Sequence, residues 1–310
     1  MVRDCFETGV SMINRYRSRA TLAVAFLALL LLSACAARPP IPQNLKVESD
    51  DLEMVADWAI RMAKDHGREN VLVVFDIDNT LLAMEQDLGS DQWYYWQKDL
   101  AASDPCNPMV VGDRFAVQGA VFYASAMRAT QPNAAEQVRR IQDAGIPTIA
   151  LTSRGTDYRL QTFRELRRQD ISFWPTAIPP RRGWSEDFVP AGVERPARYE
   201  DGVFLTAGQH KGEMLKALLD KAGVPWPALV IIADDKAHNL KDMMEAFTGS
   251  GTWVHAWRYT REDAVVAAFD PEEAASQWNE LEPALRTQER VLGPDHFELP
   301  PPTETGDCQP

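Results

Sequence analysis

The sequence contains few of the residues that build metal–thiolate centres: 4 cysteines and 5 histidines among 310 residues. Nothing groups these cysteines with histidines at the spacing of zinc sites, which argues against such a centre. The chain also lacks an excess of basic residues, since its formal net charge is −13. A general nucleic-acid binder needs a basic face that neutralises phosphates, so we predict no nucleic-acid partner. No internal repeat is present, and the composition is that of a globular protein.

The apolar run near the N-terminus, LAVAFLALLLL at residues 22–32, is too short to cross a bilayer comfortably. A basic region precedes it, and LSAC at residues 32–35 follows directly. These are the parts of a secretory signal, and the closing cysteine resembles the lipobox of bacterial lipoproteins. The resemblance implies that residues 1–35 are a signal peptide and that Cys35 receives a lipid. The alternative is an ordinary signal peptide with an incidental cysteine.

The lipoprotein interpretation predicts the location of the protein. Ala36, rather than aspartate, follows the cysteine, which favours a lipid anchor at the periplasmic face of the outer membrane. The proline-rich start of residues 36–49 predicts a tether that holds the domain off the membrane. Cys106 and Cys308 could pair in such an oxidising compartment. The sequence leaves that pairing, the choice of Met1 or Met12 as the start, and the oligomeric state open.

Residues 50–290 alternate between helix and strand patterns. Apolar runs predict strands, and helical spacing of apolar residues predicts the helices between them. Two inserts interrupt the pattern, a helical one at 83–130 and an irregular one at 173–202, and residues 291–310 form a loose tail. We predict an α/β fold, a Rossmann-like parallel sheet with helices on both faces and a small helical insert or cap. The strands are expected at 71–76, 147–153, 203–207, 228–235 and 252–259, and the helices at 50–70, 132–144, 156–169, 210–223, 236–247 and 261–288.

Polar side chains follow four of these strands, where a buried strand should not carry charge. Right-handed crossovers bring the carboxyl ends of parallel strands to one edge, where open α/β sheets bind ligands. Buried charges at that edge are costly unless a cation and an anionic ligand complete the set. The clusters are Asp76 and Asp78, Thr152 and Ser153, Lys211, and Asp234 and Asp235.

The residue types indicate which ligands these clusters bind. Clustered carboxylates suit a hard divalent ion, and we expect Mg²⁺. A lysine, a hydroxyl and backbone N–H groups at strand-to-helix turns suit a phosphate. Asp76 could attack phosphorus and form an aspartyl phosphate, and Asp78, two residues on, could protonate the leaving oxygen and later activate water. A Mg²⁺ ion would bring the anionic nucleophile and the anionic phosphate together.

The four clusters resemble the motifs of the haloacid dehalogenase superfamily. DIDNT at residues 76–80 is similar to its first motif, LTS at 151–153 to its second, Lys211 to its third and ADD at 233–235 to its fourth. The motifs occur in the expected order over about residues 71–260. The aspartate at the third position of the first motif is typical of the phosphotransfer members. LGSDQWYYWQ at residues 88–97 also resembles an uncharacterised bacterial branch, a domain family of unknown function that implies no substrate.

The resemblance implies a role for each motif residue. Asp76 would be the nucleophile and Asp78 the general acid and base, while Thr152 and Lys211 would hold the phosphoryl group. Asp76, the carbonyl of Asp78 and Asp234 would bind Mg²⁺. Alternatives stay open at several positions. Ser153 could replace Thr152, and Lys216 or Lys236 could replace Lys211. Asp235 could cap a helix instead of having an indirect metal role, and Asn79 or Arg154 could contact the substrate.

The sequence therefore predicts a lipid-anchored, Mg²⁺-dependent phosphohydrolase that acts on a small phosphate monoester. A phosphotransferase that passes the group to an acceptor alcohol would use the same residues. The alternative from another class is a non-catalytic envelope lipoprotein that keeps the fold as a binding or scaffold module. That module would be expected to have lost acids of the first or fourth motif, and none is lost here.

Overall fold

The computed structural model describes residues 40–41, 43–190, 194–293 and 299. By its internal contacts the chain divides into residues 1–40 and a second compact unit, Ile41–Pro310, and everything below concerns the second unit. The predicted signal peptide, the lipidation site Cys35 and Cys308 lie outside the described residues. Within the described part of the chain, no helix has both the length and the apolarity needed to cross a membrane.

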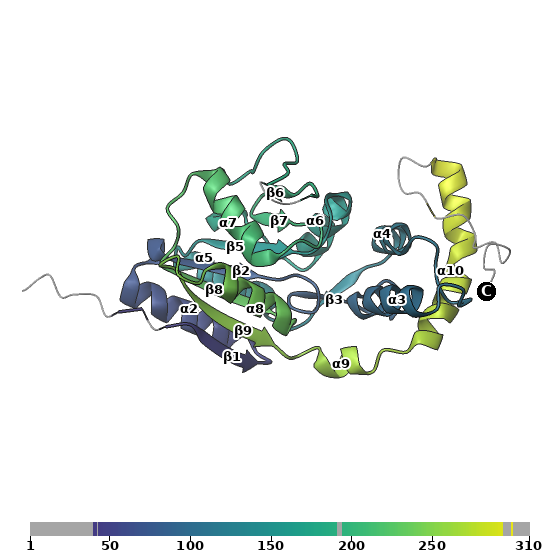
Figure 1. Ribbon diagram of the computed structural model, residues 1–310, viewed down its shortest axis with the longest axis horizontal. Helices are drawn as coiled ribbons and strands as arrows, with labels where there is room; N and C mark the ends of the chain where they lie inside the picture. Colours follow the sequence, from purple (N-terminus) through teal and green to yellow (C-terminus); the bar gives the residue numbers. More distant parts are fainter. Residues whose placement is uncertain (1–39, 42, 191–193, 294–298, 300–310) are drawn as a thin grey trace, which may run out of the picture. The chain divides into compact units, whose positions relative to one another are not determined.

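A seven-stranded sheet forms the centre of this unit, in the order β1-β9-β8-β2-β5-β7-β6 (Figure 1). Six strands are parallel and only β6 runs antiparallel, against β7. The predicted α/β fold with a mostly parallel sheet is confirmed. The strands are β1 Leu45–Ser49, β2 Val71–Phe75, β5 Thr148–Thr152, β6 Arg198–Glu200, β7 Val203–Leu205, β8 Leu229–Asp234 and β9 Trp253–Tyr259.

Helices cover both faces of the sheet because its central strands are apolar on both sides. In β2, Val71, Val73 and Phe75 face one hydrophobic cluster, and Leu72 and Val74 face the other. The first cluster packs on α2 (Leu52–His66), α5 (Ala134–Asp143) and α6 (Arg159–Arg168), and the second on α7 (Lys211–Ala222) and α8 (Ala237–Ala246).

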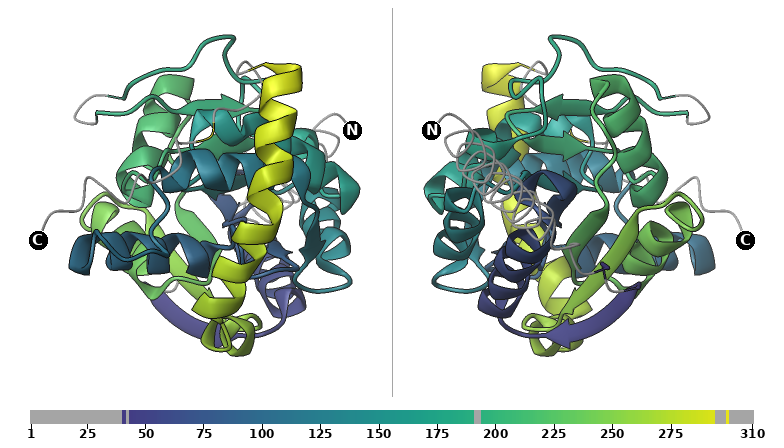
Figure 2. Two further views of the ribbon diagram at one scale, coloured as in Figure 1. Left: turned by 90° about the vertical axis from the view of Figure 1, so that its right-hand side faces the viewer. Right: turned by 90° about the vertical axis from the view of Figure 1, so that its left-hand side faces the viewer.

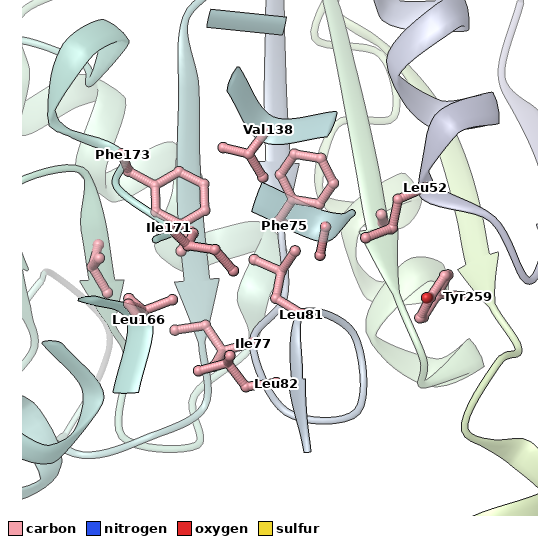
Figure 3. Close-up of a cluster of buried hydrophobic side chains, with 14 of the residues drawn as sticks. Leu52, Phe75, Ile77, Leu81, Leu82, Val138, Leu166, Ile171, Phe173 and Tyr259 are labelled. Carbon is pink, nitrogen blue, oxygen red and sulfur yellow. The ribbon is translucent and has the colours of Figure 1, made fainter. Parts of the chain in front are cut away.

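Figure 3 shows part of the first cluster, where Phe75, Val138 and Phe173 meet with Leu166 and Ile171 nearby. Phe75 and Phe173 lie with their ring centroids 6.4 Å apart. Each fully buried side chain of this size contributes about 1.5–3 kcal/mol. The cluster therefore fixes the end of β2, from which the first polar cluster of the sequence projects.

The first insert leaves the sheet after β2 and contains more than helices. Two short antiparallel strands, β3 (Leu82–Met84) and β4 (Met127–Ala129), carry the helices α3 (Asp91–Ser103) and α4 (Arg114–Ala124) (Figure 1). The helix α10 (Pro271–Leu292), yellow in Figure 2, runs past the insert and packs against α3. The chain thus returns to the insert at its C-terminal end.

Four boundaries differ from those the sequence predicted. Residues 45–49, assigned to the tether, form β1, and residues 198–200, assigned to the irregular insert, form β6. The single helix expected at 261–288 is two, α9 (Asp263–Ala267) and α10, because Asp270 caps α10 and Pro271 starts it. The tail predicted from residue 291 begins inside α10, and Leu299 is buried.

Three short 3₁₀ turns complete the described secondary structure: Arg68–Asn70, Thr156–Tyr158 and Trp174–Thr176. Cys106, in the loop between α3 and α4, forms a disulfide whose partner lies outside the described residues. Whether that partner is Cys308 stays a prediction.

Candidate active site

The first and fourth polar clusters meet where two neighbouring parallel strands end. Phe75 of β2 pairs with Ala233 of β8, and the N–H of Asp76 donates to the carbonyl of Ala233 at 2.9 Å. Thr80, for which no role was predicted, makes a second connection between the first and fourth clusters. Its Oγ1 accepts the N–H of Asp235 at 3.1 Å. The sheet therefore brings Asp76, Asp234 and Asp235 together.

Lys211, the first residue of α7, lies between two of these acids. Its Nζ is 2.7 Å from Oδ1 of Asp76 and 2.6 Å from Oδ2 of Asp234, and the lysine side chain is 1% exposed. Burial alone would lower the pKa of Lys211, but the two carboxylates raise it above its ordinary value. The alternative Lys216 lies on the surface of α7 and pairs with Glu213.

Gly212 allows α7 to approach α8 closely enough for this contact. A Cβ at position 212 would lie 2.5 Å from the Cβ of Ala246 and 2.7 Å from the carbonyl oxygen of Asp242. Glycine is required because there is no space for a side chain between the two helices. The sequence after the third motif thus positions the lysine as well as supplying it.

The three acids could hold a divalent cation. One oxygen of each of Asp76, Asp234 and Asp235 lies within 4.8 Å of the others. Asp234 is fully engaged, by Lys211, the side-chain amide of Asn239 and the N–H of Lys236, whereas Oδ1 of Asp235 is buried and has no hydrogen-bond partner in the described part of the chain. An unpaired buried carboxylate oxygen beside two other acids is the donor chemistry that hard cations select.

The protonation of these acids reflects their surroundings. Burial raises the pKa of Asp76 well above its ordinary value, and the nearby carboxylates of Asp234 and Asp235 add to the effect that Lys211 opposes. Burial also raises the pKa of Asp235 to about 7. A bound cation would favour the ionised carboxylates and lower both values.

The charged side chains around this edge do not balance. When all are ionised, five carboxylates face three cations, so two negative charges are left uncompensated. A divalent cation would neutralise that excess. The side chains are Asp76, Asp78, Asp91, Asp234 and Asp235, with Lys211, Lys236 and Arg154.

Asp78 pairs with a buried arginine. Nε and Nη2 of Arg154 donate to its two carboxylate oxygens at 2.9 and 2.8 Å. Arg154 is held in turn by Thr162 and by the ring of Phe122, 4.6 Å away in the insert. From the sequence, Arg154 was predicted only as a possible substrate contact. In the structure, Arg154 fixes the orientation of Asp78.

The second motif lies at the end of β5, next to β2. Thr152 is buried, and its Oγ1 accepts the N–H of Arg154 at 3.2 Å, whereas Ser153 is exposed. The hydroxyl of Thr152 therefore has a fixed position at the same edge as Asp76 and Asp78. Asn79, the other residue considered for substrate, contacts Gln92 of α3 at 3.4 Å.

Asp91 was not predicted as a site residue, and Lys236 was considered only in place of Lys211. Nζ of Lys236 lies 2.9 Å from Oδ2 of Asp91 and 3.2 Å from Oδ2 of Asp235, with the ring of Tyr95 5.3 Å away. Asp235 does not cap α8, because Lys236 occupies the N-cap position without a capping side chain. The only signal in the sequence was the adjacency of Lys236 to the fourth motif, and nothing indicated that Asp91 would reach it.

Comparison with known proteins identifies a family for this chain but no reaction. The family model described as "Protein of unknown function (DUF2608)" matches residues 53–290, about three quarters of the chain. The match spans the sheet from β2 to β9, the first insert and most of α10. No curated protein matches the chain.

Proposed function

The chain belongs to the DUF2608 family of proteins of unknown function, and we propose on the strength of its site that it is a Mg²⁺-dependent phosphohydrolase of the haloacid dehalogenase type. It would cleave phosphate monoesters through an aspartyl phosphate on Asp76. The observation that carries this proposal is the contact of Lys211 with both Asp76 and Asp234 beside the unpaired Oδ1 of Asp235. That arrangement would supply a nucleophile, a lysine ammonium for the phosphate and metal ligands within one buried volume.

Mg²⁺ would be held by Asp76, Asp234 and the carbonyl of Asp78, with Asp235 as a further ligand, either directly or through a water molecule. When bound, the ion would supply positive charge that lets an anionic phosphate approach an anionic nucleophile. Lys211 and the hydroxyl of Thr152 would orient the phosphoryl group. These assignments fit the excess of two negative charges described above.

Chemistry would begin at the carboxylate of Asp76. Oδ1 contacts Lys211, so Oδ2 is the oxygen left to attack phosphorus. A P–O bond to Asp76 forms as the bond to the leaving oxygen breaks, and Asp78 gives that oxygen a proton. Asp78 then takes a proton from a water molecule, the water oxygen attacks phosphorus, and inorganic phosphate leaves with the Asp76 carboxylate restored. Because Arg154 binds both oxygens of Asp78, the carboxyl group must turn away from Arg154 to act.

Hydrolysis of a generic aryl phosphate tests the proposal. The full chain would be assayed with and without Mg²⁺, beside Asp76→Asn and the exposed carboxylate variant Asp99→Asn as a matched control. We expect Mg²⁺-dependent turnover that disappears in Asp76→Asn and persists in Asp99→Asn. The proposal would be refuted if the chain shows no turnover and binds neither Mn²⁺, used as a probe in place of Mg²⁺, nor a phosphate analogue. That result would favour a binding or scaffold module. Faster substrate loss with an acceptor alcohol would identify a phosphotransferase instead.

Lipid anchoring belongs to the same proposal. The predicted signal peptide and Cys35 lie outside the described residues, and their sequence supports an envelope location at the periplasmic face of the outer membrane. Mass spectrometry of the N-terminal peptide would detect the lipid on Cys35. An unmodified Cys35 at the start of a released chain would contradict the anchor without affecting the enzymatic proposal.

A further inference from the structure

A row of three charged side chains connects the insert to the candidate metal site. Asp91 is the first residue of α3 in the insert, while Lys236 and Asp235 follow β8 in the sheet. Lys236 lies between the two carboxylates, 2.9 Å from Asp91 and 3.2 Å from Asp235. The position of the ammonium therefore depends on both parts of the unit.

Lys236 competes with any metal ion for Asp235. Its ammonium contacts Oδ2 of Asp235, whose other oxygen has no hydrogen-bond partner among the described residues. The Asp235 side chain is 7% exposed, so water compensates little of its charge. A full ion pair between Lys236 and Asp235 would remove the oxygen donor that a divalent cation needs.

Asp91 in turn competes with Asp235 for Lys236, and the shorter distance is the one to Asp91. Its place is fixed by the start of α3, where Ser90 caps the helix by accepting the N–H of Trp93. Gln92, the next residue, contacts Asn79 of the first motif. The N-terminal end of α3 therefore touches the site at two successive residues.

We propose that Asp91 is a positioning residue that sets the affinity of the site for a divalent cation, by holding Lys236 away from Asp235. The inference rests on the metal site of the proposed function. It also makes metal binding and docking of the insert interdependent, because the same lysine serves both. Thermodynamic linkage makes the two effects equal in size. If the contact between Lys236 and Asp91 strengthens cation binding at Asp235 by some factor, cation binding strengthens that contact by the same factor.

The effect of Asp91 on the cation must pass through Lys236, and a double-mutant cycle tests that route. Mn²⁺ binding to the full chain without substrate would be measured by calorimetry for wild type, Asp91→Asn, Lys236→Gln and the double variant. We expect Asp91→Asn to raise the Kd for Mn²⁺ about 5- to 20-fold, within the usual range of coupling between sites. In the Lys236→Gln background the same change should alter the Kd by less than about twofold, because the competing ammonium is gone.

Two further variants exclude simpler explanations. Asp99→Asn removes a carboxylate from the exposed side of the same helix and should leave the Kd unchanged. Asp91→Glu keeps the charge and should restore most of the binding that Asp91→Asn loses. Hydrogen exchange at residues 91–103 should slow on adding Mn²⁺ in wild type but not in Asp91→Asn, and thermal unfolding would establish that each variant is folded.

The outcomes separate this inference from the proposed function. An unchanged Kd in Asp91→Asn overturns the inference, and so does an equal loss with and without Lys236, which would mean a direct effect of the Asp91 charge on the cation. Absence of Mn²⁺ binding in wild type overturns the metal site itself, and the inference falls with it. Mn²⁺ binding in wild type with weakened binding in Asp91→Asn alone supports both.

Discussion

Replacing Lys211 by methionine should destabilise the metal-free protein strongly. The lysine ammonium is the only cation within contact distance of Asp76 and Asp234 among the described residues, and the exposed fractions of these two side chains are 7% and 0%. Removing one partner of a buried ion pair costs about 3–5 kcal/mol, because the remaining charges stay unpaired. For a folded unit of this size, that loss corresponds to a fall in Tm of about 6–20 °C.

The same variant should be partly rescued by the metal. A divalent cation at Asp76 and Asp234 would supply the charge that Lys211 lost, so the difference in free energy of unfolding should fall by about half or more in Mg²⁺. Urea unfolding of wild type and Lys211→Met, in EDTA and in excess Mg²⁺, measures both values. Lys216→Met is the matched control, since this exposed pair with Glu213 contributes at most about 1 kcal/mol. A loss below 1 kcal/mol in EDTA, or an equal loss in Mg²⁺, would refute the reasoning.

Three other predictions concern single side chains. Arg154→Gln should lower kcat about 10- to 100-fold and change its pH profile, because Asp78 loses its bidentate partner; an unchanged profile would contradict this role. Because the folded state raises the pKa of Asp235 from 3.8 to about 7, this residue stabilises the metal-free protein at low pH, and the contribution is lost as pH rises through about 7. Asp235→Asn should remove that part of the slope in unfolding free energy between pH 5 and pH 7, and an unaltered slope would exclude Asp235 as its source. Gly202→Ala should cost about 1–3 kcal/mol in urea unfolding, because φ is +83° and the added Cβ would lie 2.6 Å from a side chain and 2.9 Å from backbone; Gly223→Ala, where a Cβ meets nothing within 4 Å, should cost less.

The central strands could be predicted because their sequences have one physical explanation. VLVVF and LVIIAD are apolar at every position before the first acid, as strands covered on both faces must be. The edge strands lack that signal. LKVES of β1 is half exposed and alternates charged with apolar residues beside a proline-rich segment, and RYE of β6 has only three residues.

The candidate site likewise contains residues whose positions could be predicted and residues whose positions could not. Asp76, Lys211, Asp234 and Asp235 are near one another because parallel strands end at one edge, which follows from the order of elements alone. Asp91 reaches Lys236 only through the docking of the insert, and no periodicity in α3 predicts where its first residue lies. The partner of Asp78 was likewise hidden, because Arg154 points into the insert and toward Phe122 rather than into solvent.

The topology of the sheet also bears on how the protein folds. β1 pairs in parallel with β9, in a register that joins Leu45 to His255, so two strands at opposite ends of the sequence are neighbours. A ribosome makes β1 first, yet the strand has no partner until nearly the whole domain has been synthesised. Such non-local pairing gives a high contact order, which slows folding. Until β9 is available, β1 and the edge of β8 that receives β9 stay open to intermolecular pairing. We expect a chain with this topology to need chaperones until its last strand is available. A truncation before Trp253 would remove β9 and leave β1 permanently unpaired.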